Sequence, residues 1–180
     1  MNPWHDIAID RINSDRFISV IEIPKGCKKK YELDKDSGIL ILDRVLFTST
    51  HYPANYGFIP KTLSDDGDPM DVLVLCQECL DPLTLVNCYP IGVIKMIDNR
   101  EVDEKIIAIP FGDPSLNTYQ TISALPKHMF LEIRHFFEVY KNLEEKPTMV
   151  EQISGREEAE RVIRESIENY QRAFPETIEK

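Results

Sequence analysis

Residues 83–109 read LTLVNCYPIGVIKMIDNREVDEKIIAI, and the fold prediction begins with them. Three apolar runs stand out, at Leu83–Tyr89, Ile91–Ile97 and Lys105–Ile109, and clusters of Pro, Gly or Asp separate them from their surroundings. Short runs rich in Ile and Val between such residues are typical of β-strands. The middle of the chain therefore predicts three consecutive strands.

Similar patterns continue on both sides of this region. Before it, further strands are expected at Phe17–Ile23, Tyr31–Asp34, Ile39–Phe47 and Val72–Cys76. After it, apolar residues recur at helical spacing, first from about Pro126 to Leu143 and then from about residue 155 to 174. The pattern Ser154-x-x-Glu157 matches a capping box, which predicts the start of the second helix.

The order of these elements indicates the fold class. Strands come first and helices last, which is typical of an α+β protein, and many short strands within 180 residues favour a small closed β-barrel. We expect one domain over residues 1–180, with the barrel at about 17–110 and C-terminal helices flanking it at about 126–143 and 155–174.

Composition narrows the possible functions. The chain is 42% hydrophobic, enough for a core, and its formal net charge is −10. Because phosphate contacts supply most of the affinity of nucleic-acid binders, so acidic a chain argues against that class. No apolar stretch approaches the roughly 18 residues that a membrane span needs, and no secretory signal is visible. We expect a soluble cytoplasmic protein.

The strongest local feature is an acidic run that leads into a predicted strand. Asp65 and Asp66 are followed by Asp68 and Asp71 within seven residues. Carboxylates so close together are costly unless a cation neutralises them, and hard oxygen ligands suit Mg²⁺, Mn²⁺ or Ca²⁺. An EF-hand is excluded, because its required glycine is replaced by Asp71. An acidic surface turn remains the alternative.

Other charged residues join this pattern. Two acids, Asp98 and Asp103, stand at the edges of paired strands, and two more, Glu22 and Glu32, interrupt strands. Basic and phenolic residues alternate with these acids, and together they suggest a multiply charged anionic ligand: Lys30, Arg44, Lys105, Lys141, Tyr52, Tyr56 and Tyr140. Acids for divalent metals combined with cations for an anion are typical of a phosphoryl-transfer site.

Cysteine and histidine give weaker signals. Cys76 and Cys79 form a C-x-x-C pair, but no second pair completes a zinc site, and the pair follows a strand rather than opening a helix. The four histidines show no metal-ligand spacing. Trp4 is interpreted as a packing anchor for the N-terminal segment.

These residues resemble the soluble family I inorganic pyrophosphatases. Asp66–Val72 fits that family's signature D-x-D-P-x-D-x, and the likeness spans roughly residues 17 to 142 in family order. It continues through Val20–Pro24, Lys30–Asp34, Asp43–Arg44, Tyr52–Ile59, Gly92–Asp98 and His135–Lys141.

The resemblance implies a five-stranded OB-like barrel and hydrolysis of pyrophosphate to two orthophosphates. It implies several Mg²⁺ ions per site, for which Mn²⁺ can substitute, and a homo-oligomer, expected to be a hexamer. No nucleic acid and no membrane are expected as partners. It also implies residue roles. Asp68 would be the general base; the metal ligands would be Asp66, Asp71, Asp98, Asp103 and Glu32, supported by Glu22; Lys30, Arg44, Tyr56, Lys105, Tyr140 and Lys141 would bind the substrate.

Two other readings stay open at this point. An OB-fold module could bind oligonucleotides or anionic ligands, because the fold alone does not fix a function. Against it stand the acidic balance and the lack of alternating aromatic and basic residues on the strands. A passive Ca²⁺-binding domain would bind metal and release no phosphate.

Overall fold

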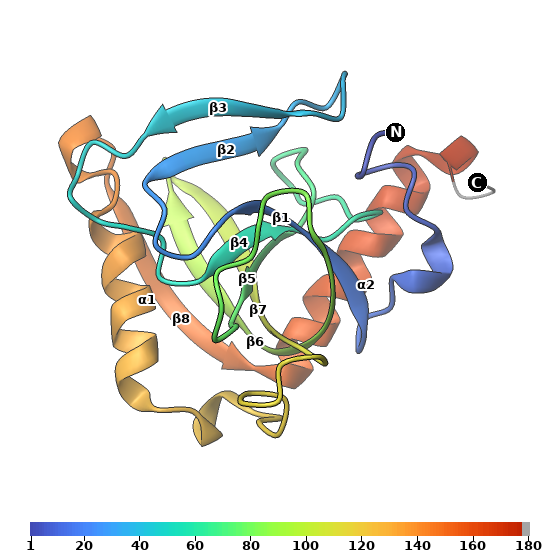
Figure 1. Ribbon diagram of the computed structural model, residues 1–180. Coiled ribbons are helices and arrows are strands. Elements are labelled where there is room, and N and C mark those ends of the chain that lie inside the picture. Colours follow the sequence, from blue (N-terminus) through green and yellow to red (C-terminus); the bar gives the residue numbers. More distant parts are fainter. Residues whose placement is uncertain (178–180) are drawn as a thin grey trace.

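A closed ring of five strands forms the centre of the protein (Figure 1), whose computed structural model describes residues 1–177. Around the ring, β1 pairs with β4, β4 with β5, β5 with β7, β7 with β6, and β6 again with β1. The predicted small closed barrel is confirmed. Its strands are β1 (Phe17–Ile23), β4 (Asn55–Phe58), β5 (Asp71–Val74), β6 (Leu85–Asp98) and β7 (Glu101–Pro110).

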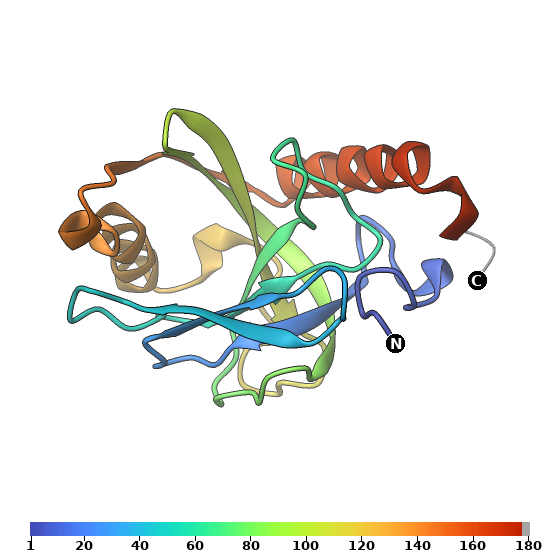
Figure 2. The same cartoon turned by 90° about the horizontal axis from the view of Figure 1, so that it is seen from above.

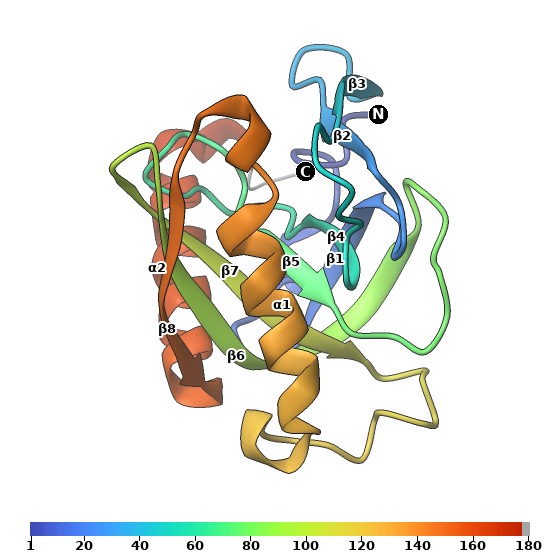
Figure 3. The same ribbon diagram turned by 90° about the vertical axis from the view of Figure 1, so that its left-hand side faces the viewer.

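A separate hairpin and two helices surround this ring. Strands β2 (Lys29–Leu33) and β3 (Leu40–Val45) pair only with each other, and in Figure 2 their hairpin lies nearest to the viewer, across the barrel. β8 (Thr148–Gly155) extends the sheet beyond β6. Figure 3 shows α1 (Lys127–Val139) beside β8, with α2 (Arg156–Ala173) on the far side of that strand. Short 3₁₀ turns occupy Ile9–Arg11, Ile122–Ala124, Asn142–Glu144 and Pro175–Thr177.

Successive side chains along the strands point alternately into two hydrophobic cores, and the same alternation places the charged side chains of the site on one face. Leu73 of β5 and Ile107 of β7 pack with α1, whereas the neighbouring Val72 packs with α2. Because side chains alternate with a period of two, Asp71 and Lys105 share the face of Leu73 and Ile107. The two strands are parallel, with Asp71 opposite Lys105. The α1 face of the barrel therefore ends in charged residues.

The hairpin between β6 and β7 brings two of the acids to this same end. Asn99 and Arg100 both adopt positive φ angles, of 50° and 72°, which a tight two-residue turn between antiparallel strands requires. Asp98 then pairs with Glu101, and Asp103 pairs with Met96. Asp98 is the last residue of β6, as the sequence predicted, whereas Asp103 lies inside β7, which begins at Glu101 and not at the predicted Lys105.

Several predicted boundaries were wrong. The two strands expected at 83–89 and 91–97 form one strand, β6, in which the register shifts between Pro90 and Gly92. A strand tolerates a proline where pairing is irregular. Strands β4 and β8 were not predicted. Among the described residues, no helix is long and apolar enough to cross a membrane.

Both helices also differ in detail from their predictions. α1 ends at Val139 instead of Leu143, and residues Asn142–Glu144 form a 3₁₀ turn that stops at Glu145 with a φ of 56°. The predicted capping box is absent: Gly155 is the N-cap of α2, and it makes no side-chain capping hydrogen bond. Ser154 instead belongs to β8, where it pairs with Val93. Trp4 is buried, as expected of a packing anchor.

Candidate active site

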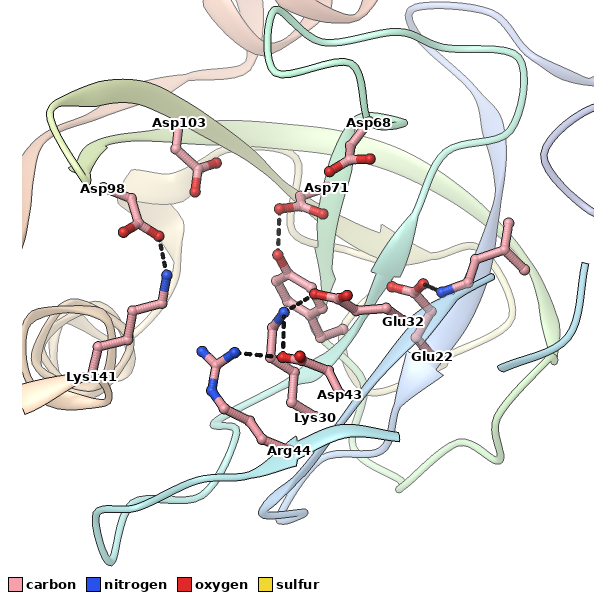
Figure 4. Close-up of polar contacts among 12 residues, drawn as sticks. Glu22, Lys30, Glu32, Asp43, Arg44, Asp68, Asp71, Asp98, Asp103 and Lys141 are labelled. Carbon is pink, nitrogen blue, oxygen red and sulfur yellow. Dashed lines mark hydrogen bonds and ion pairs between the residues drawn. The ribbon is translucent and has the colours of Figure 1, made fainter. Parts of the chain in front are cut away.

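A polar cavity of about 390 Å³ lies between the β2–β3 hairpin, the acidic loop before β5, the β6–β7 hairpin and the end of α1. The structure brings twelve of the thirteen predicted site residues together in its lining. They are Glu22, Lys30, Glu32, Tyr56, Asp66, Asp68, Asp71, Asp98, Asp103, Lys105, Tyr140 and Lys141. Figure 4 shows the carboxylates of Asp68, Asp71, Asp98 and Asp103 around a shared space.

Arg44 is the predicted residue that does not line this cavity. It lies on β3, where its guanidinium pairs with Asp43 and its Nε donates to Glu144 at 3.0 Å. In Figure 4 it lies beside Lys30 at the hairpin side of the site. Arg44 thus belongs to the rim, where the hairpin meets the segment that follows α1.

The acidic loop is shaped by its own backbone bonds. Gly67 adopts a φ of 84°, a left-handed conformation that glycine takes without strain, and its N–H donates to the carbonyl of Ser64 at 3.1 Å. The amide of Asp68 donates to Asp66 Oδ1 at 3.0 Å. Burial raises the pKa of Asp66 above its usual value despite this bond. This carboxylate therefore gains from any nearby cation.

Lys105 is the buried cation at the centre of the acids. Its Nζ donates to Asp71 at 2.6 Å, to Asp103 at 3.0 Å and to the phenolic oxygen of Tyr56 at 3.0 Å. Burial alone would lower the pKa of Lys105, but the charges of Asp103 and Asp71 outweigh it and raise the pKa well above its usual value. Tyr56 in turn donates to Asp71. Lys105 is therefore charged and holds two carboxylates.

A second pair joins the barrel to α1. Lys141 donates to Asp98 Oδ2, and Tyr140 lies buried beside it. Burial raises the pKa of Tyr140, so its hydroxyl keeps its proton and can donate it in a hydrogen bond. The other oxygen of Asp98, Oδ1, is buried without a hydrogen-bond partner in the described part of the chain. An unpaired buried carboxylate oxygen is costly and is suited to accept a cation.

The hairpin side of the cavity carries a third group. Lys30 pairs with Glu32 and lies 3.3 Å from Asp43 Oδ2. Glu22 is buried on β1, where its Oε1 accepts the amide of Leu33 at 2.7 Å. Burial, assisted by the charge of Asp71, raises the pKa of Glu22 to about 8. Glu22 therefore fixes β2 to the barrel.

The charge balance of the lining favours bound cations. Seven carboxyl groups face four lysine ammonium groups, and because Glu22 keeps its proton near neutral pH, six carboxylates remain, an excess of two negative charges. An anionic ligand could not enter such a cavity unless cations first reversed its charge. The hard oxygen donors and the unpaired Asp98 Oδ1 both fit divalent metal ions. Within residues 1–177 no three potential ligands already converge on one point, because Lys105 lies between Asp71 and Asp103.

Sequence reasoning missed some of the lining. Lys35, just beyond β2, adds a fourth lysine, and Tyr52 and Phe137 add apolar wall. Tyr52 was named as a phenolic donor without a place in the site. Lys35 lies in the turn between β2 and β3, where the sequence pattern does not show in which direction a side chain points. Only the position of the hairpin over the barrel reveals that direction.

Comparison with known families matches residues 19–171 to the family described as inorganic pyrophosphatase. Among curated proteins, the chain is 48% identical to soluble inorganic pyrophosphatase 2 of Chlamydomonas reinhardtii, over 96% of this chain and 90% of the relative. It is also 48% identical to the inorganic pyrophosphatase of Aquifex pyrophilus, over 95% and 93%.

Solved structures agree with this match. The inorganic pyrophosphatase of Helicobacter pylori superposes with a TM-score of 0.86 at 44% identity, covering 88% of this chain and 95% of the other. The Thermus thermophilus enzyme gives a TM-score of 0.89 at 37% identity, covering 94% and 99%.

Proposed function

The chain belongs to the inorganic pyrophosphatase family, and is thus a hydrolase acting on pyrophosphate; we propose that it cleaves this substrate in the carboxylate-lined cavity with Mg²⁺ as its cofactor. The observation that carries the proposal is the gathering of seven acids and four lysines from five separate parts of the chain into one cavity. The family resemblance stated from the sequence is confirmed; the metal and the residue roles below are proposed.

The carboxylates divide into metal ligands and a base. We assign Asp66, Asp71 and Asp103 to a first metal ion, with Asp71 shared with a second. Asp98 joins Asp103 at a third, and Glu32 supports a further one, with Glu22 holding β2 in place behind it. When bound, Mg²⁺ lowers the pKa of a water molecule and neutralises phosphate charge, and Mn²⁺ has similar oxygen-ligand preferences.

Asp68 is the proposed general base. It lines the cavity next to two assigned ligands, and its side chain remains half exposed, so water has access to it. A water oxygen bonds to one phosphorus while the bond from that phosphorus to the bridging oxygen breaks, and the proton of the water passes to Asp68. Tyr56 donates to Asp71 and keeps that carboxylate oriented.

The cations bind the substrate in this proposal. Lys30, Lys105 and Lys141 line the cavity and carry charge that the phosphate oxygens require, while the hydroxyl of Tyr140 adds a neutral donor. Arg44 reaches the substrate from the rim if it exchanges its contact with Asp43 for a phosphate oxygen. Each lysine is already paired with a carboxylate, so both metal and substrate binding rearrange existing ion pairs.

We also propose that the enzyme is a cytoplasmic homo-oligomer, a hexamer as expected from the family. Exposed apolar side chains on and beside β3 support association: Ile41 and Phe47 are 56% and 61% exposed. Light scattering should give six times the 20.9 kDa mass of the chain. A monomer at micromolar concentration would contradict the hexamer, and cell fractionation tests the location.

Phosphate release tests the main proposal. Purified protein with pyrophosphate and Mg²⁺ should release two orthophosphates per substrate, excess chelator should stop the reaction, and Mg²⁺ should restore it. Ca²⁺ should support little activity, because its longer and looser coordination misplaces the attacking water. Full hydrolysis in excess chelator would refute the metal-dependent mechanism. Single-stranded DNA serves as a control ligand and should not bind.

A further inference from the structure

Lys35 contacts the proposed base from across the cavity. It follows β2 at the tip of the hairpin, and its Nζ pairs with the carboxylate of Asp68. The same Nζ donates to the carbonyl of Gly67 at 3.3 Å. One ammonium group therefore holds both the side chain and the backbone of the acidic loop at its most bent point.

The N-terminal segment holds Lys35 in turn. Asn2 Nδ2 donates to the Lys35 carbonyl at 2.7 Å, and the Lys35 ammonium lies 5.8 Å from the centre of the Trp4 ring. Trp4 Nε1 donates to the carbonyl of Thr62 at 2.9 Å, and Thr62 Oγ1 accepts the amide of Met70 at 2.9 Å. The segment thus connects the hairpin tip to the foot of the acidic loop.

Within residues 1–177, the Asp68 carboxylate has no second side-chain contact of this kind. Its amide and carbonyl make bonds within the loop, to Asp66 and Ser64, and these fix the backbone but leave the side chain free to turn. In the described part of the chain, Lys35 is the only ion-pair partner of Asp68. A half-exposed carboxylate with one anchor changes its direction when the anchor is removed.

We propose that Lys35 is a positioning residue that aims the Asp68 carboxylate at the site of water attack. This inference rests on the proposed function, and it adds a residue that the family resemblance did not supply. Lys35 acts through Asp68 and not on the substrate, because both of its polar contacts in the loop are with Asp68 and its neighbour. The ion pair is exposed on both sides, so its loss changes stability little.

A double-mutant cycle tests this role. Lys35→Met keeps the aliphatic stem and removes the charge; we expect kcat to fall about tenfold with KM near the parent value, since a misplaced reactive group costs up to about 10²-fold. Lys35→Arg should recover part of the loss, because a guanidinium can pair with the same carboxylate. In an Asp68→Asn background, Lys35→Met should cause no further loss, because the group it positions is gone.

The control is Lys25→Met, which removes an equal charge from an exposed residue outside the cavity lining. It should hydrolyse pyrophosphate like the parent, and circular dichroism should show the same fold for all variants. The proposal is overturned if Lys35→Met loses the same factor with Asp68 and with Asn at position 68, or if only KM rises, since Lys35 would then bind substrate. A parent without any pyrophosphate hydrolysis refutes the proposed function instead.

Discussion

Replacement of Lys105 by Met should destabilise the protein in the absence of divalent metal. In the parent protein the Lys105 ammonium lies 5.4 Å and 5.6 Å from the ring centres of Tyr56 and Phe137. Methionine keeps the packing of the aliphatic part of this side chain. It removes three polar contacts and the only ammonium between Asp71 and Asp103 in the described residues. The loss therefore reports the electrostatic role of the lysine.

The magnitude follows from burial. Removing one partner of a buried ion pair costs about 3–5 kcal/mol. Here the side chains of Asp71 and Asp103 remain 30% and 21% exposed, so water recovers part of that loss. We expect about 2–4 kcal/mol at pH 8. For a chain of this length each kcal/mol lowers Tm by about 2–4 °C, which gives a decrease of roughly 4–16 °C.

The pH dependence distinguishes this cause from a packing defect. Burial raises the pKa of Asp103 even while Lys105 opposes the shift, so in the variant the Asp103 carboxyl group holds its proton more tightly than in the unfolded chain. Carboxyl groups with a raised pKa in the folded state favour folding at low pH and lose that contribution as pH rises. The cost of Lys105→Met should therefore be largest at pH 8 and smaller at pH 5.

Urea unfolding with chelator, at both pH values, measures the effect, and Lys25→Met is the charge-matched control. A cost below about 1 kcal/mol at pH 8 would refute the electrostatic role assigned to Lys105. A cost equal at the two pH values would show that the stem, and not the charge, is responsible. Added Mg²⁺ should restore much of the lost stability, because it supplies positive charge to the same acids.

Three further outcomes are expected. Asp68→Asn should lower kcat by roughly 10²–10⁴-fold, while the Mg²⁺ concentration needed for activity stays nearly unchanged. Asp71→Asn should lower kcat and also raise the Mg²⁺ concentration needed for activity. The opposite pattern would reverse the roles of the two residues. Serine at both Cys76 and Cys79 should leave phosphate release close to the parent rate, and a large loss with intact circular dichroism would show that the C-x-x-C pair has a function. Burial lowers the pKa of His5, so the folded state should lose stability as pH falls below about 6.5, the pKa of an unperturbed histidine. In a His5→Phe variant, the free energy of urea unfolding should change less between pH 8 and pH 5. Parallel pH profiles for parent and variant would show that His5 does not cause this loss of stability.

The sequence predicted the barrel where residue patterns are strong. In β7 the apolar residues after Lys105 mark a buried strand, and the acids at Asp98 and Asp103 mark its connection to β6. β4 escaped prediction because it is only four residues long and contains Gly57, which usually weakens a strand. The structure supplies the reason for this glycine: a Cβ there would lie 1.9 Å from the carbonyl oxygen of Val20.

The C-terminal region shows where local signals mislead. Ser154 and Glu157 have the spacing of a capping box, but Ser154 lies in β8, so tertiary pairing outweighs the local preference. Helical spacing continues to Tyr140 and Leu143, yet the helix ends at Val139 and Lys141, two residues later, contacts Asp98. Local spacing carries no information about this long-range contact.

The sequence predicted which residues form the candidate site better than it predicted how these residues are arranged. Motif spacing and resemblance named the acids, but neither could show that Lys105 lies between two of them or that Arg44 stays at the rim. Lys35 has no sequence signal at all, since its role depends on the hairpin tip meeting a loop more than thirty residues away.

The closed ring also determines when the enzyme can first work during its synthesis. Closure pairs Phe17 with Cys88, and the cavity is completed only by Tyr140 and Lys141 at the end of α1. A nascent chain that has emerged as far as β7 carries every carboxylate of the site but lacks these last two groups. Because distant segments must meet before any contact repays the lost chain entropy, such topologies fold in milliseconds to seconds. Catalytic competence should therefore arise only late in folding, after the ribosome has released most of the chain.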